Sequence, residues 1–137
     1  MAQSAAPQQF LGTWKLVAMR TRRGDGSQVE PYGPEPLGYI TYTADGYMHA
    51  ILMDPDLPGA AAPVEVPGTA LAYAATWEVR GVEVVHHVAA GLPTQWTGTD
   101  LVRNYAFDGD CMTLTAHAPG DRSVTLVWQR TGPATQP

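Results

Sequence analysis

Two adjacent histidines, His86 and His87, are the residues of this sequence best suited to acid–base chemistry near neutral pH. They lie in a run of β-forming residues, and neighbours on a strand point to opposite faces, so they cannot jointly bind a metal ion from that strand. Alternation groups His86 with Val84 and Val88, which favours His86 on the apolar face, although Val85 accompanies His87. The inward histidine is either a general acid–base or oxygen-directed donor, or a core residue hydrogen-bonded to a neighbouring strand.

Arg103 is the third candidate catalytic residue, because alternation places it on one strand face with Tyr105 and Phe107. An arginine on an apolar face needs an acceptor, since an isolated buried charge is very costly. As a functional group it would clamp a carboxylate or enolate oxygen and stabilise developing negative charge. Two alternatives stay open, namely an ion pair with Glu78 or Glu83, and an outward-facing side chain.

Aromatic residues are unusually frequent for one small domain, and rings with hydroxyl or imidazole tips are typical of a pocket for a flat or polyene-like ligand. Each of them taken singly is more often structural than ligand-binding. Trp14 and Trp128 are assigned mainly to closing one end of the fold, and Tyr42 adds a further ring. The candidate substrate-binding residues are Tyr39, Thr41, Tyr73, Trp77, Trp96, Tyr105 and Trp128.

Other site chemistries find little support, and no cofactor or metal is expected. His49 and His117 lack the spacing of a metal-ligand pair. The chain has three serines, none in a nucleophile-elbow motif, and its one cysteine, Cys111, has no nearby cation to activate it. A phosphate-binding glycine loop and a dinucleotide fingerprint are both absent from the sequence.

Length and composition bound the class of protein. The 137 residues, 45% hydrophobic and 15% charged, predict one globular domain over residues 1–137 with its core at about 10–130. A formal charge of −5 argues against nucleic-acid binding, and no apolar run is long enough for a membrane span. The first residues lack the pattern of a secretion signal, so a cytoplasmic location is expected. Arginines outnumber lysines seven to one, a hint of a bacterial source.

Alternating apolar residues and turn signals predict eight strands in simple succession. Short turns join most of them, so the sheet should be antiparallel and able to close into an eight-stranded up-and-down β-barrel, with an open sandwich as the alternative. Pro-rich loops are expected at 31–36 and 54–68, a short helix at 69–74, and a further loop at 91–99. The predicted strands are 12–19, 38–43, 47–53, 75–80, 82–89, 101–107, 111–117 and 124–130.

The chain resembles the lipocalin-like domain family of small bacterial and fungal proteins over about residues 10–130. Residues 10–14, Phe-Leu-Gly-Thr-Trp, are similar to the Gly-x-Trp signature that opens the first lipocalin strand. The resemblance implies that an arginine late in the last strands packs across Trp14 and closes the barrel. It is carried further by an ordered series of motifs at Pro34, 38–46, Met48, 77–79, 85–88, Pro93, Trp96, Gly98, Arg103 and 128–130. Some relatives act as cyclases in natural-product pathways, including ones that promote Diels–Alder closure.

The sequence therefore predicts a small β-barrel that encloses a hydrophobic, oxygenated molecule and promotes a cofactor-free cyclisation or isomerisation, as in polyketide-type biosynthesis. Arg103 and the inward histidine, helped by tyrosine hydroxyls, would polarise a carbonyl or move one proton. The alternative is a non-catalytic carrier of a hydrophobic metabolite, and a solid barrel serving as an interaction module is a third reading. A homodimer through an outer sheet face is compatible with the sequence.

Overall fold

Alternating apolar and polar residues form strands along most of the chain, joined mainly by short turns. The computed structural model describes residues 7–55 and 70–132. Two short 3-10 helices lie in these ranges, η1 (Pro7–Gln9) and η2 (Thr94–Trp96). The strands are β1 (Gly12–Arg22), β2 (Gln28–Val29), β3 (Leu37–Tyr42), β4 (Tyr47–Met53), β5 (Ala70–Arg80), β6 (Glu83–Leu92), β7 (Asp100–Asp108), β8 (Cys111–Ala118) and β9 (Arg122–Arg130).

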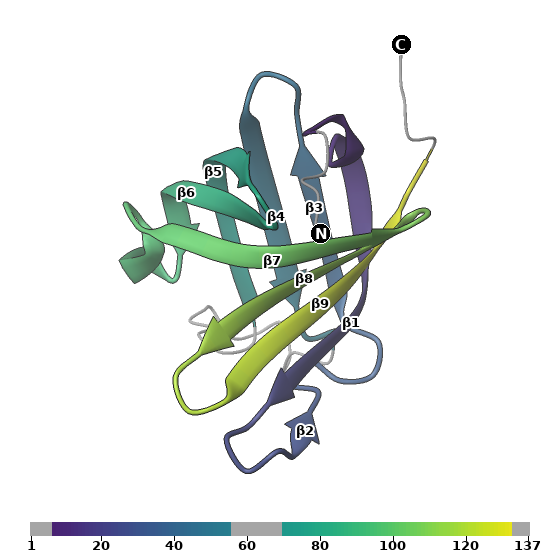
Figure 1. The fold of residues 1–137 in the computed structure, drawn as a ribbon, viewed down its shortest axis with the longest axis vertical. Coiled ribbons are helices and arrows are strands. Elements are labelled where there is room, and N and C mark those ends of the chain that lie inside the picture. Colours follow the sequence, from purple (N-terminus) through teal and green to yellow (C-terminus); the bar gives the residue numbers. More distant parts are fainter. Residues whose placement is uncertain (1–6, 56–69, 133–137) are drawn as a thin grey trace, which may run out of the picture.

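The strands close into a barrel, as the sequence predicts. Strands β3 to β9 pair antiparallel in chain order, and β1 lies between β3 and β9 so that the sheet has no free edge there. The two-residue β2 only pairs with the end of β1 and adds nothing to the wall. Figure 1 shows the resulting eight-stranded barrel, with β7, β8 and β9 crossing in front. The all-β barrel is thus confirmed and the open sandwich is wrong.

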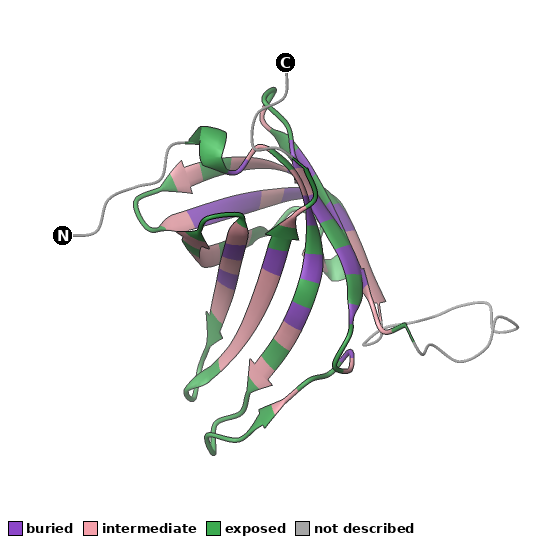
Figure 2. Ribbon diagram, turned by 90° about the vertical axis from the view of Figure 1, so that its right-hand side faces the viewer, coloured by how far each residue is buried: buried purple, intermediate pink, exposed green. Residues whose placement is uncertain are grey.

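Burial alternates along the strands with the period of two that the sequence shows. On β1, Trp14, Leu16 and Ala18 are buried, while Lys15 and Val17 are exposed. Figure 2 shows the same banding of buried and exposed residues on several strands. The wall therefore has an apolar inner face and a wetter outer face.

One end of the barrel, here called the closed end, is filled by aromatic rings and sealed by an arginine. The Trp14 indole donates a 2.9 Å hydrogen bond to the Phe10 carbonyl. The Arg130 guanidinium stacks over the Trp14 ring at 4.0 Å and donates to the Leu11 and Gln9 carbonyls. The Phe10 ring lies 4.9–5.5 Å from four further rings, those of Tyr42, Trp77, Tyr105 and Phe107. The predicted arginine–tryptophan closure is present, with Arg130 as its arginine.

The predicted helix at 69–74 is wrong where the structure describes it. Residues 70–74 belong to β5, hydrogen-bonded to β4 on one side and, from Ala72, to β6 on the other. The alanine-rich stretch has helix propensity, but two ladders of backbone hydrogen bonds outweigh that weak preference. Residue 69 and positions 56–68 of the loop predicted at 54–68 lie outside the described residues. The predicted loop at 91–99 is partly regular, since β6 runs to Leu92 and η2 follows.

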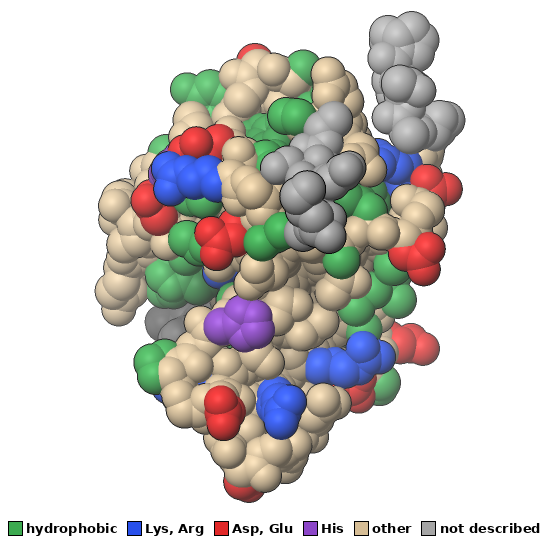
Figure 3. Space-filling view, viewed as in Figure 1, with side chains coloured by type: hydrophobic (Ala, Val, Ile, Leu, Met, Phe, Trp, Pro, Cys, Tyr) green, Lys and Arg blue, Asp and Glu red, His purple; other side chains and the backbone are tan. Residues whose placement is uncertain are grey.

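The other end of the barrel, here called the open end, holds the turn between β8 and β9, the turn after β1 and the segment containing η2. On the face drawn in Figure 3, acidic and basic side chains are interspersed. In the described part of the chain, no helix has the length and apolarity needed to span a membrane. The space between the open end and the aromatic filling is where a ligand could enter.

Candidate functional site

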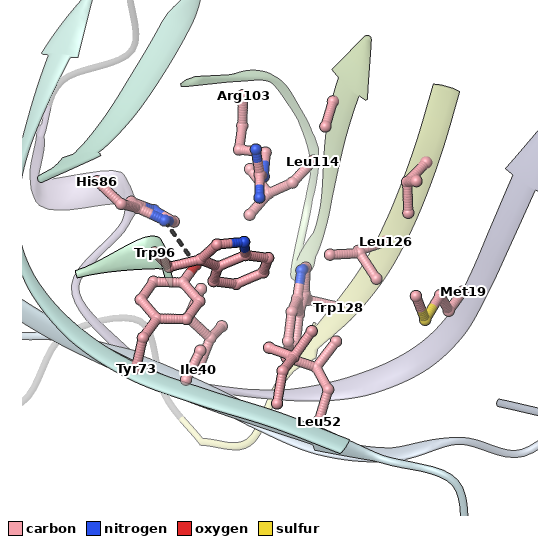
Figure 4. Close-up of a pocket in the computed structure, with 14 residues that line it drawn as sticks. Met19, Ile40, Leu52, Tyr73, His86, Trp96, Arg103, Leu114, Leu126 and Trp128 are labelled. Atoms are coloured by element: carbon pink, nitrogen blue, oxygen red, sulfur yellow. Dashed lines mark hydrogen bonds between the residues drawn. The ribbon is translucent and has the colours of Figure 1, made fainter. Parts of the chain in front are cut away.

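A cavity of about 230 Å³ occupies the barrel between the open end and the aromatic filling of the closed end. Every strand of the barrel contributes to its wall, and η2 adds one tryptophan (Figure 4). The lining is mostly aliphatic and aromatic, with few polar groups. The residues that line it are Met19, Ile40, Ala50, Leu52, Leu71, Tyr73, His86, Trp96, Arg103, Leu114, Ala116, Val124, Leu126 and Trp128.

His86 is the buried polar centre of this site. It lies on the inner face of β6 with Val84 and Val88, as alternation favours, and its exposed fraction is 0%. Its Nε2 lies 2.7 Å from the Tyr42 hydroxyl and its Nδ1 lies 2.8 Å from the Tyr73 hydroxyl. Both ring nitrogens are therefore engaged by tyrosines from two different strands, in the manner of a core histidine bonded to its neighbours.

Electrostatics keep these three residues uncharged at neutral pH. Burial, and secondly the positive charge of Arg103, lowers the pKa of His86 from 6.5 to about 3. Burial raises the pKa of Tyr73 from 10.0 to about 12, and it raises the pKa of Tyr42 well above its usual value. A neutral imidazole carries one N–H, so one nitrogen donates to a tyrosine and the other accepts from the second tyrosine.

Among the described residues that line the cavity, Arg103 is the one with a charged side chain (Figure 4). It lies on β7 opposite Val84, and its guanidinium donates a 3.3 Å hydrogen bond to the Val102 carbonyl. Within residues 7–55 and 70–132, no carboxylate lies within 4.0 Å of it. The expected alternatives, Glu78 and Glu83, are therefore not its ion-pair partners.

Two tryptophans, Trp96 and Trp128, line the cavity together with Tyr73, His86 and Arg103. Trp96, on η2, packs edge-on against the Tyr73 ring at a centroid distance of 5.6 Å. Gly91 leaves room beside this pair, because a Cβ there would lie 3.2 Å from the Tyr73 Cβ, which is closer than most such contacts. Trp128 is 1% exposed, and its indole N–H has no hydrogen-bond partner among the described residues. An unpartnered donor in a buried wall is rare in native proteins.

The structure gathers only part of the residues predicted from the sequence. Tyr39 is 45% exposed and shares the outer face of β3 with Thr41, whose hydroxyl bonds Thr13 across the strands. Trp77 and Tyr105 point inward but belong to the closed end, against Phe10. The predicted residues that line the cavity are His86, Arg103, Tyr73, Trp96 and Trp128.

His87 lies on the outer face, away from the cavity. Its Nδ1 is 2.7 Å from an Asp100 oxygen and its Nε2 is 2.7 Å from a Glu78 oxygen. The hydrogen bond that the ring donates to Asp100, and then the one that it donates to Glu78, raises the pKa of His87. Since both nitrogens of His87 face acceptors, the doubly protonated, charged ring fits this position best, whereas His86 is neutral.

Tyr42 is the residue that sequence reasoning left out of the site. It is 1% exposed and holds His86 from the side opposite Tyr73. Alternation places Tyr42 on one face with Ile40 but does not say which face is inside, and its contact with a histidine 44 residues away depends on the register of the barrel. Among the described residues, no group of three or more His, Cys, Asp or Glu side chains could hold a metal ion.

The opposite pKa shifts of the two histidines predict a pH signature. The pKa of His86 is about 3 in the folded protein against 6.5 unfolded, so below pH 6.5 the unfolded chain takes up a proton that the folded one does not. Between pH 6.5 and 5 this residue should therefore lower the free energy of unfolding by ~1.4 kcal/mol per pH unit. Urea unfolding across this range should show a shallower slope for His86→Gln than for the wild type.

His87→Gln is the matched control for this measurement. Because its pKa is raised in the folded state, its stabilising contribution is complete below pH 6.5 and is lost as the pH rises through the folded pKa. His87→Gln should keep the wild-type slope between pH 6.5 and 5 and differ above it. Parallel curves for the wild type and His86→Gln below pH 6.5 would show that His86 is not held neutral by the fold.

Solved structures of other small β-barrels resemble this one. A de novo designed fluorescence-activating β-barrel is 15% identical, with a TM-score of 0.46, over 90% of this chain and 95% of that one. A mutant of the fluorescent protein UnaG is 10% identical, with a TM-score of 0.46, over 93% and 100% of the two chains. Secretory abundant heat soluble protein 4 from Ramazzottius varieornatus is 11% identical, with a TM-score of 0.46, over 93% and 99%.

Sequence comparison gives the stronger result. No curated protein matches the chain. Residues 11–131, which run from the start of β1 to just beyond β9, match the family model of the lipocalin-like domain. This match includes the Trp14 signature, the histidine pair and the arginine of the cavity. The chain belongs to the lipocalin-like domain family.

Proposed function

We propose that the protein binds a small, mainly apolar molecule inside the barrel and fixes it through one oxygen atom of that molecule. The observation that carries this proposal is the Arg103 guanidinium, which enters an otherwise apolar cavity without a carboxylate partner among the described residues. Few convergent polar groups in an apolar pocket are the usual design of a ligand site. The guanidinium bonds the Val102 carbonyl, but among the described residues the wall supplies no negative charge to balance it.

The size of the cavity limits the ligand. At about 230 Å³ it is smaller than the pockets of roughly 300–1,000 Å³ that hold drug-sized molecules. A ligand of one or two rings fits inside, and a longer one would extend through the open end. The rings of Tyr73, Trp96 and Trp128 favour a flat ligand, because they offer broad and rigid contact surfaces.

Filling the cavity is expected to abolish binding. Ala116 lines the cavity from the inner face of β8, and a phenylalanine there would occupy much of the 230 Å³. Ala106 lies on the outer face of β7, so Ala106→Phe adds the same bulk outside the barrel. In calorimetric titrations with 2-naphthamide and 2-naphthoate, we expect at least tenfold weaker binding to Ala116→Phe and no change for Ala106→Phe. If neither probe binds the wild type, or if both variants bind equally well, the barrel interior is not the ligand site.

A second, finer candidate is a cofactor-independent cyclase or isomerase of natural-product biosynthesis. Its support is that Arg103 and the Tyr73 hydroxyl lie on one cavity, where hydrogen-bond donors can stabilise negative charge that develops on a carbonyl oxygen. Rigid walls also favour a folded, reactive conformer of a flexible substrate. His86 is neutral and both of its nitrogens are bonded to tyrosines, so it is better placed to orient the Tyr73 hydroxyl than to take a proton from a substrate. The test is to measure turnover of substrates that bind. If turnover never exceeds the uncatalysed rate, the protein is a carrier and not an enzyme.

A further inference from the structure

The polar groups of the cavity are nearly all hydrogen-bond donors. The guanidinium of Arg103 and the indole N–H groups of Trp96 and Trp128 can donate and cannot accept. The other described lining residues are aliphatic or, at Met19, a thioether, apart from Tyr73 and His86, which are bonded to each other. Whether the Tyr73 hydroxyl can donate to a ligand therefore depends on which of Tyr73 and His86 supplies the proton of their shared hydrogen bond.

Two proton arrangements fit the distances around His86. In the first, the Tyr42 hydroxyl donates to Nε2 and the Nδ1–H donates to the Tyr73 oxygen, which leaves the Tyr73 proton free to face the cavity. In the second, Tyr73 donates to Nδ1 and the Nε2–H donates to the Tyr42 oxygen. The free proton then belongs to Tyr42.

Burial selects the first arrangement. Tyr42 is 1% exposed and packs against the Phe10 and Trp77 rings. Among the described residues its hydroxyl bonds only His86, so in the second arrangement its proton would be buried without an acceptor, which is unfavourable. Tyr73, by contrast, lines the cavity, where a ligand can accept its proton. Tyr42 and His86 thus act as positioning residues that turn the Tyr73 hydroxyl into a donor.

In the described part of the wall, the cavity then presents a fixed positive charge and hydrogen-bond donors, with no free oxygen or nitrogen acceptor among the lining side chains. Figure 4 shows Arg103 together with the other lining side chains, and the hydrogen bond that ties Tyr73 to His86. Such a set matches an oxygen anion that accepts several bonds at once. We infer that the ligand is the carboxylate anion of a small aromatic or alicyclic acid, held by Arg103 and Tyr73, an inference that rests on the proposed function.

The decisive comparison uses two probes of one shape, 2-naphthoate and its neutral amide, 2-naphthamide. Hydrogen bonds to charged groups are worth about 1.5–3 kcal/mol, so the wild type should bind the carboxylate at least about tenfold more tightly. Arg103→Met should remove this preference and Arg103→Lys should keep most of it. Arg80→Met, on the outer face beside Glu78, should leave both affinities unchanged.

The outcomes separate this inference from the proposed function. Equal affinity for the two probes in the wild type would overturn the anionic ligand and leave small-molecule binding intact. A preference that survives in Arg103→Met would show that the charge lies elsewhere. Binding of neither probe would overturn both.

The proton arrangement has its own readout. Long-range proton–nitrogen correlation spectra of the ¹⁵N-labelled wild type should show the His86 proton on Nδ1. In Tyr42→Phe the donor to Nε2 is lost, so Tyr73 becomes the only tyrosine partner and the proton should shift toward Nε2. This variant should also bind 2-naphthoate several-fold more weakly, although Tyr42 does not line the cavity. A proton on Nε2 in the wild type would overturn the role given to Tyr73.

Discussion

His86→Leu is expected to lower the free energy of unfolding by about 2–5 kcal/mol, although leucine is close to histidine in size. The loss arises because the Tyr42 and Tyr73 hydroxyls both bond the imidazole, and an unsatisfied buried hydroxyl costs about 1–3 kcal/mol. Tyr42 carries most of the effect, since it is fully enclosed, whereas Tyr73 borders the cavity. Urea unfolding of the variant and the wild type at pH 7 gives the difference.

A compensating substitution distinguishes this cause from poor packing. In the double variant His86→Leu with Tyr42→Phe, both members of the Tyr42–His86 hydrogen bond are removed, and such exchanges can be nearly neutral, while the Tyr73 hydroxyl can still turn to the cavity. The double variant should therefore recover much of the stability that His86→Leu loses. If Tyr42→Phe instead adds its own loss to that of His86→Leu, the hydrogen-bonded pair is not what makes the histidine necessary.

Trp14→Ala is expected to cost about 3–5 kcal/mol, the range for removing a large aromatic side chain from a core. The indole is fully buried, packs against Phe107 and supports the Arg130 guanidinium at 4.0 Å. Its loss also leaves the Phe10 carbonyl without its indole donor. The contacts of Phe10, Phe107 and Arg130 at the closed end should therefore weaken together.

Val17→Ala on the same strand is the control for Trp14→Ala. Val17 is 49% exposed, so the change should stay within about 0.5 kcal/mol. Thermal and urea unfolding of both variants provide the comparison. A loss below about 1 kcal/mol for Trp14→Ala would mean that the closed end does not depend on the tryptophan–arginine stack.

Much of the fold could be predicted from the sequence, because its signals are local. Period-two alternation and glycine-containing turns fix the eight strands of the barrel wall, and the same alternation puts His86 inside. The sequence of strand β3 does not show which of its side chains face the interior. Gly38, Ile40 and Tyr42 point inward while Tyr39 points outward, yet nearly all these residues are good strand formers, so polarity gives no sign of the direction.

Depth along the barrel is the information that a single sequence lacks. Tyr73, Trp77 and Tyr105 all face inward, but only Tyr73 borders the cavity and the other two fill the closed end. The position of an inward-facing residue along the barrel axis depends on the register between strands and on their tilt. Local alternation determines neither of these. The meeting of Tyr42 with His86 has the same origin.

The seam between β1 and β9 governs when the barrel can form. It pairs Trp14 with Arg130 and continues to Arg22 with Ser123, residues from opposite ends of the described chain. Contacts of such large sequence separation form late and slow folding, because the intervening chain must first be ordered. During synthesis the first strand is made early but must wait for the ninth, and until then β1 and β8 both expose unpaired edges open to association with other chains. The pairing that removes every edge from the native wall is thus also the step at which folding and aggregation compete.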